Sequence, residues 1–308
     1  MKKIVIALGG NALGDTALTQ QELVEEAAKP IVDLIESGNK VIITHGNGPQ
    51  VGMINLGMNY AYENSIIKGE MPFPECSAMS QGYIGYHLQN AIGNELKRRN
   101  INKEIVCIVT QVLVDKYDEA FKKPTKPIGA FYDEETANKL TIEKGWVMVE
   151  DAGRGFRRVV ASPKPKDIVE KNMINCLVDN DYVVITVGGG GIPVIEESDS
   201  LKGIPAVIDK DFASAKLAEL VNADALFILT AVDRVCINYG KTNQKELSAM
   251  TIDECNKYIA EKQFAPGSML PKVLACMEFA KTGGTAIIAD LKNAKYALNG
   301  ESGTKITK

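Results

Sequence analysis

Three glycine-rich segments are the clearest candidates for chemistry in this 308-residue chain. They span residues 9–14, 46–52 and 188–191, and each directly follows a short apolar run rich in Val and Ile. Such runs are typical of buried parallel strands. Glycine lets backbone N–H groups approach an anion, and a helix that begins there adds the positive end of its dipole. One such loop alone is more simply a tight turn, but three at strand ends favour one crevice that binds phosphate-bearing ligands.

Three lysines stand in contexts that suit a phosphoryl group. Lys210 lies between Asp209 and Asp211 after an apolar stretch, so that charge pairing could hold it in place. Lys272 lies at the start of an expected helix, where a cation opposes the helix dipole, which hints at a function. Lys126 lies in a basic loop stiffened by prolines 124 and 127, which could cover an anionic substrate. Taken singly, these lysines also fit a solvated turn, a tolerated surface lysine and a charged hinge.

Two familiar nucleotide-binding motifs are not satisfied. The spacing from Gly9 to Gly14 is close to that of a P-loop, but Asp15 stands where the lysine should be, and its carboxylate would repel a phosphate. The dinucleotide fingerprint fails at residues 46–52, because its third glycine is at position 52, not 51, and Pro49 intrudes. The sequence therefore argues against an NAD-dependent oxidoreductase.

Composition narrows the class of protein. With 35 basic and 39 acidic residues the net charge is −4, which argues against nucleic-acid binding and requires local lysines and amides to bind anions. No apolar run reaches the roughly 20 residues that cross a bilayer, so we expect a soluble cytoplasmic protein with no membrane contact. Six scattered cysteines lack C-x-x-C spacing and are expected to be reduced thiols. His45 and His87 are expected to be hydrogen-bonded structural residues, and two histidines cannot form a histidine-rich zinc site.

Strands and helices alternate along most of the chain, which predicts a parallel α/β sheet with right-handed crossovers. The expected strands cover about residues 3–8, 40–44, 105–109, 182–187, 225–229 and 286–289. One expected helix has a Thr19–Glu22 capping box and a kink at Pro30, and another begins near Pro49. Further helices are expected at about residues 77–99, 167–179, 213–221 and 271–281. Prolines and clustered basic residues at 117–165 predict an insertion that projects over the crevice, although an ordinary solvated excursion is equally compatible.

Together these motifs resemble those of the carbamate kinases, in the amino-acid-kinase family. The resemblance rests on residues 8–13, 46–52, 123–129, 153–160, 188–193, 207–211 and 267–272, whose order and spacing fit over nearly the whole chain. It implies an α/β fold, a three-layer αβα sandwich around a largely parallel central sheet, with a small protruding subdomain. It also implies a homodimer of single 1–308 domains. Each domain would have a carbamate lobe at about 1–210, a protruding subdomain at about 117–158, and a nucleotide lobe at about 211–308.

The resemblance further implies an activity and roles for residues. The reaction is reversible phosphoryl transfer between ATP and carbamate, giving ADP and carbamoyl phosphate, with Mg²⁺ bound to the nucleotide. In fermentative microbes it runs toward ATP at the end of the arginine deiminase route. Lys210 and Lys272 would bracket the phosphoryl group, Asp211 would hold both lysines, and Lys126 would reach in from the subdomain. The implied substrate-binding residues are Gly9, Gly10, Asn11, Gly46, Asn47, Gly48 and Pro49. The implied nucleotide-binding residues are Gly189, Gly190, Ala231, Val232, Asp233, Val235, Met269 and Lys272.

Alternatives within and beyond the family stay open. Many amino-acid kinases carry a lysine two residues before the first Gly-Gly pair, where this chain has Ala7. Carbamate kinases share that absence, which counts against acetylglutamate kinase. A non-catalytic nucleotide-sensing protein or another amino-acid kinase of the same fold is the alternative, and the sequence does not separate a catabolic from an anabolic direction. No His stands beside a candidate Ser, so we expect direct in-line transfer without a phosphoenzyme.

Overall fold

The structure is a computed structural model, and it describes residues 1–9, 13–14, 16–151 and 153–308. Its centre is an eight-stranded sheet of order β15-β17-β16-β12-β1-β2-β9-β3. The pair β16–β17 is antiparallel, and the other six neighbouring pairs are parallel. The strands are β1 (Lys3–Leu8), β2 (Lys40–His45), β3 (Ile105–Cys107), β9 (Val183–Ile185), β12 (Ala225–Thr230), β15 (Ala249–Thr251), β16 (Thr285–Asp290) and β17 (Thr304–Thr307).

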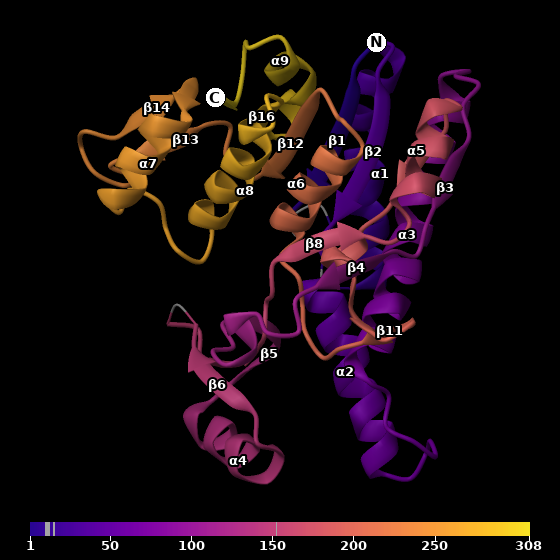
Figure 1. The fold of residues 1–308 in the computed structure, drawn as a ribbon, viewed down its shortest axis with the longest axis vertical. Coiled ribbons are helices and arrows are strands. Elements are labelled where there is room, and N and C mark those ends of the chain that lie inside the picture. The colour runs from indigo at the N-terminus through magenta and orange to yellow at the C-terminus, as the bar shows by residue number, and fades with distance from the viewer. Residues whose placement is uncertain (10–12, 15, 152) are drawn as a thin grey trace.

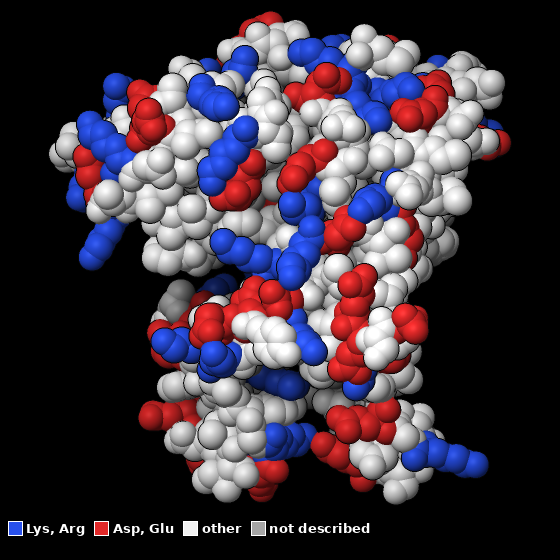
Figure 2. Space-filling view, in the orientation of Figure 1, with Lys and Arg blue, Asp and Glu red and all other residues white. Residues whose placement is uncertain are grey.

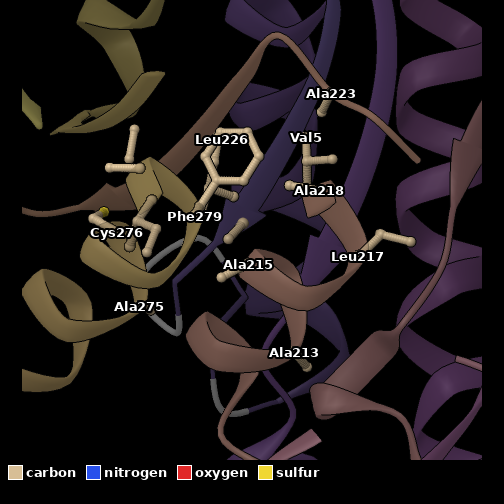
Figure 3. Close-up of a cluster of buried hydrophobic side chains, with 14 of the residues drawn as sticks. Val5, Ala213, Ala215, Leu217, Ala218, Ala223, Leu226, Ala275, Cys276 and Phe279 are labelled. Carbon is tan, nitrogen blue, oxygen red and sulfur yellow. The ribbon is translucent and has the colours of Figure 1, made fainter. Parts of the chain in front are cut away.

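Helices cover both faces of this sheet (Figure 1). In β1, Ile4, Ile6 and Leu8 join one buried apolar cluster. Val5 and Ala7 join the other, because successive side chains of a strand point to opposite faces. The first cluster is completed by α1 (Ala17–Glu36), α3 (Phe73–Arg98) and α9 (Ala294–Leu298), and the second by α5 (Lys171–Asp179), α6 (Lys210–Leu220), α7 (Ile252–Ala260) and α8 (Met269–Lys281). Figure 3 shows α6 and α8 contributing small side chains to the second cluster. The predicted αβα sandwich with a largely parallel sheet is confirmed.

Smaller sheets are attached to the sandwich. A four-stranded sheet of order β11-β10-β4-β8 and a pair β13–β14 flank it. Their bounds are β4 (Gln111–Val114), β8 (Pro165–Ile168), β10 (Ile192–Glu197), β11 (Ser200–Gly203), β13 (Val235–Ile237) and β14 (Lys245–Leu247). Short 3₁₀ helices are η2 (Glu119–Phe121), η3 (Gly188–Gly190) and η4 (Leu291–Asn293).

The protrusion predicted from the sequence is present as a separate three-stranded sheet of order β5-β7-β6. It comprises β5 (Lys126–Tyr132), β6 (Val147–Glu150), β7 (Phe156–Val160) and α4 (Glu134–Lys144). It projects below the main body in Figure 1, and β5 packs against α2 (Gly48–Glu63). Two chain segments, around residues 115–125 and 161–164, connect this sheet to the sandwich. Contacts with the main body, such as that of β5 with α2, hold it in position.

Two helices begin earlier than predicted because capping residues lie upstream. The predicted Thr19–Glu22 capping box is wrong: Thr16 caps α1, and its side chain accepts a hydrogen bond from the Thr19 N–H at 3.2 Å. Thr19 is instead the reciprocal partner in the box that Thr16 opens. Similarly, α6 begins at Lys210 and not near residue 213, since the side chain of Asp209 caps it.

Other differences arise from pairing between distant segments. Residues 165–168 form β8 and not the start of the predicted 167–179 helix, because they pair with β4. The strand predicted at 105–109 is shorter and half-buried, since β3 is the last strand of the large sheet. The helix α1 continues through Pro30 to Glu36.

Within the described ranges, no helix combines the length and the apolar character that crossing a membrane requires.

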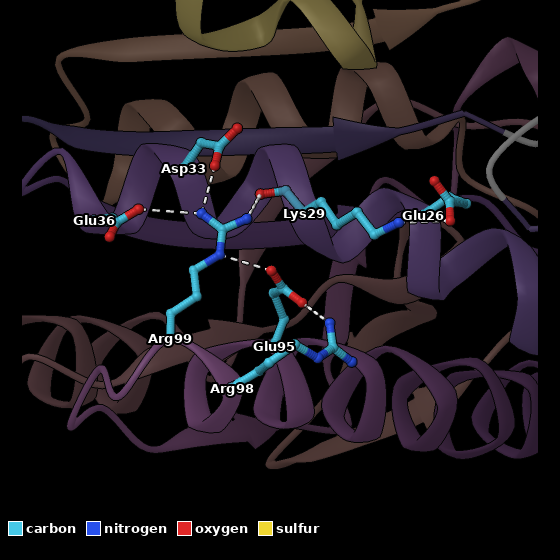
Figure 4. Close-up of polar contacts among 7 residues, drawn as sticks. All are labelled: Glu26, Lys29, Asp33, Glu36, Glu95, Arg98 and Arg99. Carbon is cyan, nitrogen blue, oxygen red and sulfur yellow. Dashed lines mark hydrogen bonds and ion pairs between the residues drawn. The ribbon is translucent and has the colours of Figure 1, made fainter.

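An ionic network ties α1 to α3 on the outside of the sandwich (Figure 4). Arg99 donates hydrogen bonds to Asp33 at 2.5 Å, to Glu95 at 2.6 Å and to Glu36 at 3.1 Å. The side chain of Glu95 is buried and also contacts Arg98. A buried carboxylate that loses a cationic partner is costly, so Arg99 should contribute more to stability than an ordinary surface arginine.

We predict that Arg99→Met lowers the free energy of unfolding by about 2 kcal/mol, because it removes charge-assisted hydrogen bonds from a buried carboxylate. Arg98→Met is the matched control, since that side chain is 66% exposed, and it should cost less than about 1 kcal/mol. Urea unfolding followed by circular dichroism measures both. Equal decreases in the free energy of unfolding of the two variants would show that the position of Arg99 between α1 and α3 adds nothing to stability.

Candidate active site

The candidate active site lies at the carboxyl ends of β12, β1, β2 and β9, which are neighbours in the sheet. Leu8 pairs with His45, so the loops after β1 and β2 leave the sheet side by side. The N–H of Gly46 donates to the Leu8 carbonyl at 3.2 Å. A methyl group on Gly9 would lie 2.9 Å from the Leu229 carbonyl oxygen, so the end of β12 is equally close. With η3 following β9, all three predicted glycine-rich segments leave the same sheet edge.

The structure describes most of the predicted substrate-binding residues, but not all of them. Gly10 and Asn11 lie outside the described residues. Gly46 lies beside Lys210, because a methyl group on Gly46 would be 3.4 Å from the Lys210 Cδ. Asn47 donates from its side chain to the Ser80 hydroxyl at 2.8 Å, which fixes this loop to α3. Gly48 and Pro49 then begin α2, and the proline occupies its first turn as predicted.

Two helix starts bring Lys210 and Lys272 together at Asp211. Lys210 is the first residue of α6 and Lys272 the fourth residue of α8, and the two helices pack against each other. The Nζ of Lys210 donates to Oδ1 of Asp211, and the Nζ of Lys272 donates to Oδ2 at 2.9 Å. Each ammonium group therefore takes one oxygen of the same buried carboxylate. The resemblance to the carbamate kinases implied this pairing of Asp211 with both lysines.

Electrostatics within the cluster favour its charged form. Burial lowers the pKa of Lys210, an effect that the Asp211 carboxylate opposes. Burial tends to raise the pKa of Asp211, but the ammonium groups of Lys210 and Lys272 outweigh it and lower that pKa to about 2. Asp211 is therefore ionised at neutral pH, and its charge opposes the effect of burial on Lys210.

Lys126 reaches the same place from the protruding sheet. It is the first residue of β5, and its Nζ donates to Oδ2 of Asp209 at 2.5 Å. Asp209 precedes α6 directly, so the start of this helix gathers the side chains of three lysines and two aspartates. Three positive and two negative groups leave a net charge of +1, which suits an anion. Figure 2 shows the surface hollowed between the main body and the protruding part, with basic side chains grouped near the border.

A cavity of about 910 Å³ opens beside Lys272, and its size suits a nucleotide. Val232 and Met269, both predicted to bind nucleotide, line it together with Lys272. The lining also includes residues that were not predicted, among them Arg234, Cys236, Tyr239, Lys262 and Phe264. Arg234, Cys236 and Tyr239 lie within nine residues of the end of β12, so the end of this predicted strand could have indicated them. No motif marks the loop that carries Lys262 and Phe264.

Gly189 and Gly190, also predicted to bind nucleotide, lie in η3 and do not line this cavity. A methyl group on Gly189 would lie 2.1 Å from the Asn47 Nδ2. A methyl group on Gly190 would lie 2.2 Å from the Ile208 carbonyl oxygen. Both glycines have positive φ, so their role in this structure is to let the third glycine-rich segment pack against the second one and against the segment before Lys210.

Three residues after β12 also lie away from the cavity. Val235 is fully buried in the apolar core. Asp233 accepts hydrogen bonds from Asn293 at 3.1 Å and from Ser302, and so ties this segment to the C-terminal part of the chain. Ala231 lines a different hollow, next to α1. Their side chains therefore support or flank the nucleotide-sized cavity, and Val232 is the member of the predicted run that faces it.

His45 is the last residue of β2 and directly precedes the second glycine-rich segment. Its side chain is fully buried, and its Nδ1 lies 2.8 Å from the Gly46 carbonyl oxygen, to which it donates when neutral. Burial lowers the pKa of His45 to about 4, so the ring is uncharged at neutral pH and supports the loop. His87 packs against the rings of Tyr83 and Tyr86, and its buried Nδ1 has no hydrogen-bond partner among the described residues, contrary to expectation.

The fold and these contacts define a class of protein: a largely parallel α/β sandwich with a positively charged lysine cluster at the carboxyl edge of its sheet, next to a nucleotide-sized cavity. The model of the amino acid kinase family matches residues 2–290. A carbamate kinase of Clostridium perfringens is 58% identical over 313 residues, which cover 99% of this chain and 100% of the relative. A carbamate kinase-like protein of Escherichia coli is 54% identical over 99% of each chain.

A solved structure extends this likeness to three dimensions. The carbamate kinase from Giardia lamblia bound to AMP-PNP superimposes with a TM-score of 0.91 at 45% identity, over 100% of this chain and 98% of the other. The chain belongs to the amino acid kinase family and, within it, to the carbamate kinases. The resemblance inferred from the motifs is thus confirmed, and with it the prediction of a kinase.

We predict that His45 makes the fold sensitive to acid. The unfolded chain protonates this histidine near pH 6.5 and the folded chain only near pH 4. Between these values the unfolded state binds more protons, so stability is lost as pH falls through this window, by about 3 kcal/mol in all. His45→Asn keeps a donor for the Gly46 carbonyl and should abolish this loss. Urea unfolding at pH 7, 6, 5 and 4 measures it, and parallel pH curves for the two proteins would contradict a neutral buried ring.

Proposed function

We propose that this protein transfers a phosphoryl group reversibly between ATP and carbamate, giving ADP and carbamoyl phosphate. One observation carries the proposal: Asp211 bridges Lys210, which lies beside Gly46, and Lys272, which lines the nucleotide-sized cavity. The two lysines thus join the glycine-rich loops to the cavity. The names of the relatives, and the AMP-PNP complex of one of them, support this assignment.

In the proposed mechanism the phosphoryl group moves between the two substrates while Lys210 and Lys272 contact its oxygens. Carbamate or carbamoyl phosphate binds on the side of Gly46, Asn47 and Gly48, and the nucleotide binds in the cavity. The ammonium groups of Lys210 and Lys272 neutralise charge on the phosphoryl oxygens, where placement and electrostatics supply most of the catalysis. Both nucleophiles, the carbamate oxygen and the β-phosphate oxygen of ADP, are already anionic, so transfer is direct and needs no general base.

We propose that Mg²⁺ enters with the nucleotide and neutralises phosphate charge when bound. In the parts of the chain that the structure describes, no three His, Cys, Asp or Glu side chains gather as a metal site. Asp209 and Asp211 are each paired with lysine. This set of donors fits an ion held mainly by nucleotide phosphates and water, which is a common environment for Mg²⁺.

The wider assignments follow from the same proposal. Residues of about 1–210 form the carbamate lobe and those of about 211–308 the nucleotide lobe, with the subdomain of about 117–158 as a cover. We propose that the reaction runs toward ATP at the end of arginine deiminase fermentation, in the cytoplasm. Metabolite levels in cells with and without the protein, grown on arginine, would test this direction.

We predict ATP formation when the protein is supplied with ADP, Mg²⁺ and carbamoyl phosphate, measured with a coupled hexokinase assay. Lys210→Ala and Lys272→Ala should each lower turnover by about 100-fold or more, as loss of a charge-stabilising donor does elsewhere. Lys281→Ala is the control, because this exposed lysine lies at the far end of α8 and pairs with Glu278.

Two outcomes would contradict the proposal. Binding of ATP without any ATP formation from carbamoyl phosphate would favour the alternative, a non-catalytic nucleotide-sensing protein. Near-normal turnover in both Lys210→Ala and Lys272→Ala would remove these lysines from the phosphoryl site.

We also propose a homodimer formed through α3 and the edge strand β3. β3 ends the large sheet, and a hollow of about 510 Å³ beside it is lined by residues of α3 that include Tyr86 and Gly93. Tyr86 is 59% exposed and Val109, which follows β3, is 51% exposed. A hollow at the open edge of a sheet, lined by Tyr86, Ile105 and Val109 together with the amide side chains of Gln89, Asn90 and Asn94, suits a second copy of the same surface.

For this interface we predict that Tyr86→Asp weakens self-association by about tenfold or more, since a buried charge replaces an aromatic contact. Tyr117→Asp is the control, because Tyr117 is more exposed and lies near the protruding sheet. Sedimentation velocity over a range of concentrations measures the association. A monomeric wild-type protein at micromolar concentration would exclude the dimer.

A further inference from the structure

Asp209 uses its two carboxylate oxygens for two different elements. Oδ1 accepts a hydrogen bond from the Asp211 N–H at 2.9 Å and thereby caps α6. Oδ2 accepts from the Nζ of Lys126 at 2.5 Å. The carboxylate side chain is 16% exposed and that of Lys126 is 34% exposed, so the pair is partly shielded from water. One aspartate therefore connects the protruding sheet to the helix start that carries Lys210.

The protruding sheet is already held against α2 by its backbone. A methyl group on Gly52 would lie 2.5 Å from the Gly129 Cα and 2.7 Å from its nitrogen, so β5 and α2 meet without side chains between them. This contact sets where β5 lies, but it leaves the long side chain of Lys126 free to choose among rotamers. The ion pair with Asp209 selects the orientation in which the ammonium group faces the start of α6.

Charge explains why a second aspartate is needed. Asp211 is shared between Lys210 and Lys272 through both of its oxygens. A third ammonium group brought to the same helix start would be repelled by these two, and the repulsion is weakly screened in a partly buried site. Asp209 offsets that repulsion, and the net charge that remains is still positive.

We propose that Asp209 is the positioning residue for Lys126: it holds this ammonium group at the phosphoryl site before carbamoyl phosphate binds. This rests on the proposed function, in which Lys126 contacts the substrate. An ammonium group that is already placed loses less conformational freedom on binding, so the benefit appears in the affinity for carbamoyl phosphate. The incoming phosphoryl oxygens then share Lys126 with Asp209, and no covalent bond of the protein changes.

The test separates the charge of Asp209 from its capping role. Asp209→Asn keeps an oxygen that can cap α6 but lacks the negative charge. It should raise the KM for carbamoyl phosphate about tenfold and change kcat less. Asp209→Ala also loses the cap and should in addition lower the melting temperature. The control is Glu63→Gln, since Glu63 pairs with Lys144 at 2.6 Å and joins α2 to α4 far from Lys210; its KM should equal that of the wild type.

A double variant gives the sharper readout. If Asp209 acts through Lys126, then Lys126→Met combined with Asp209→Asn should have the KM of Lys126→Met alone, because without Lys126 the aspartate has no ammonium group to position. The side chain of Lys126, followed by NMR without substrate in protein labelled at its lysines, should be more mobile in Asp209→Asn than in the wild type. An unchanged KM in Asp209→Asn, or additive effects in the double variant, would overturn the proposal.

The outcomes also separate this proposal from the proposed function. Absence of ATP formation by the wild-type protein would refute the function and leave the NMR measurement of Lys126 to decide on Asp209. Unchanged mobility of the Lys126 side chain in the Asp209→Asn protein would then overturn the positioning role.

Discussion

The buried carboxylate of Asp211 is the constraint on which the site depends. Two ammonium groups in a shielded place repel each other, and burial alone disfavours the charge on Lys210. Removing one partner of a buried ion pair typically costs about 3–5 kcal/mol. The cluster can therefore exist only where α6 and α8 both begin, with one oxygen of Asp211 for each lysine. Packing of these helices on the sheet (Figure 3) is thus also what keeps the charges together.

The glycine-rich segments follow from the same geometry. Their backbones must approach one another at the sheet edge, and side chains would prevent it at Gly189, where a methyl group would overlap Asn47. Asn47 is in turn held by Ser80, and the neutral ring of His45 lies behind the loop. Uncharged groups thus shape the side of the site on which the proposed substrate binds. The positive charge comes from elements that arrive later in the chain.

The sequence predicted the features that depend on neighbouring residues. β1, β2 and the helix start at Pro49 were correct, because an apolar run and a proline act locally. The helix predicted at 167–179 begins too early, because residues 167 and 168 belong to β8, whose partner strand lies more than 50 residues away. The capping of α1 was misplaced by three residues, since Thr16 and Thr19 both begin sequences that fit a cap. The contact of Lys126 with Asp209, 83 residues apart, could not be predicted from either residue.

The absence of a lysine before the first glycine-rich segment has a counterpart in the packing. Ala7 is fully buried in the cluster to which α6 contributes, and α6 lies directly against β1. Small residues such as Ala213 and Ala218 on this helix allow the close approach. Because the helix lies so near the strand, its first residue emerges at the sheet edge beside Gly46. In the proposed function Lys210 supplies the positive charge for which β1 has no lysine, and the aspartates that flank it decide which other lysines can join it.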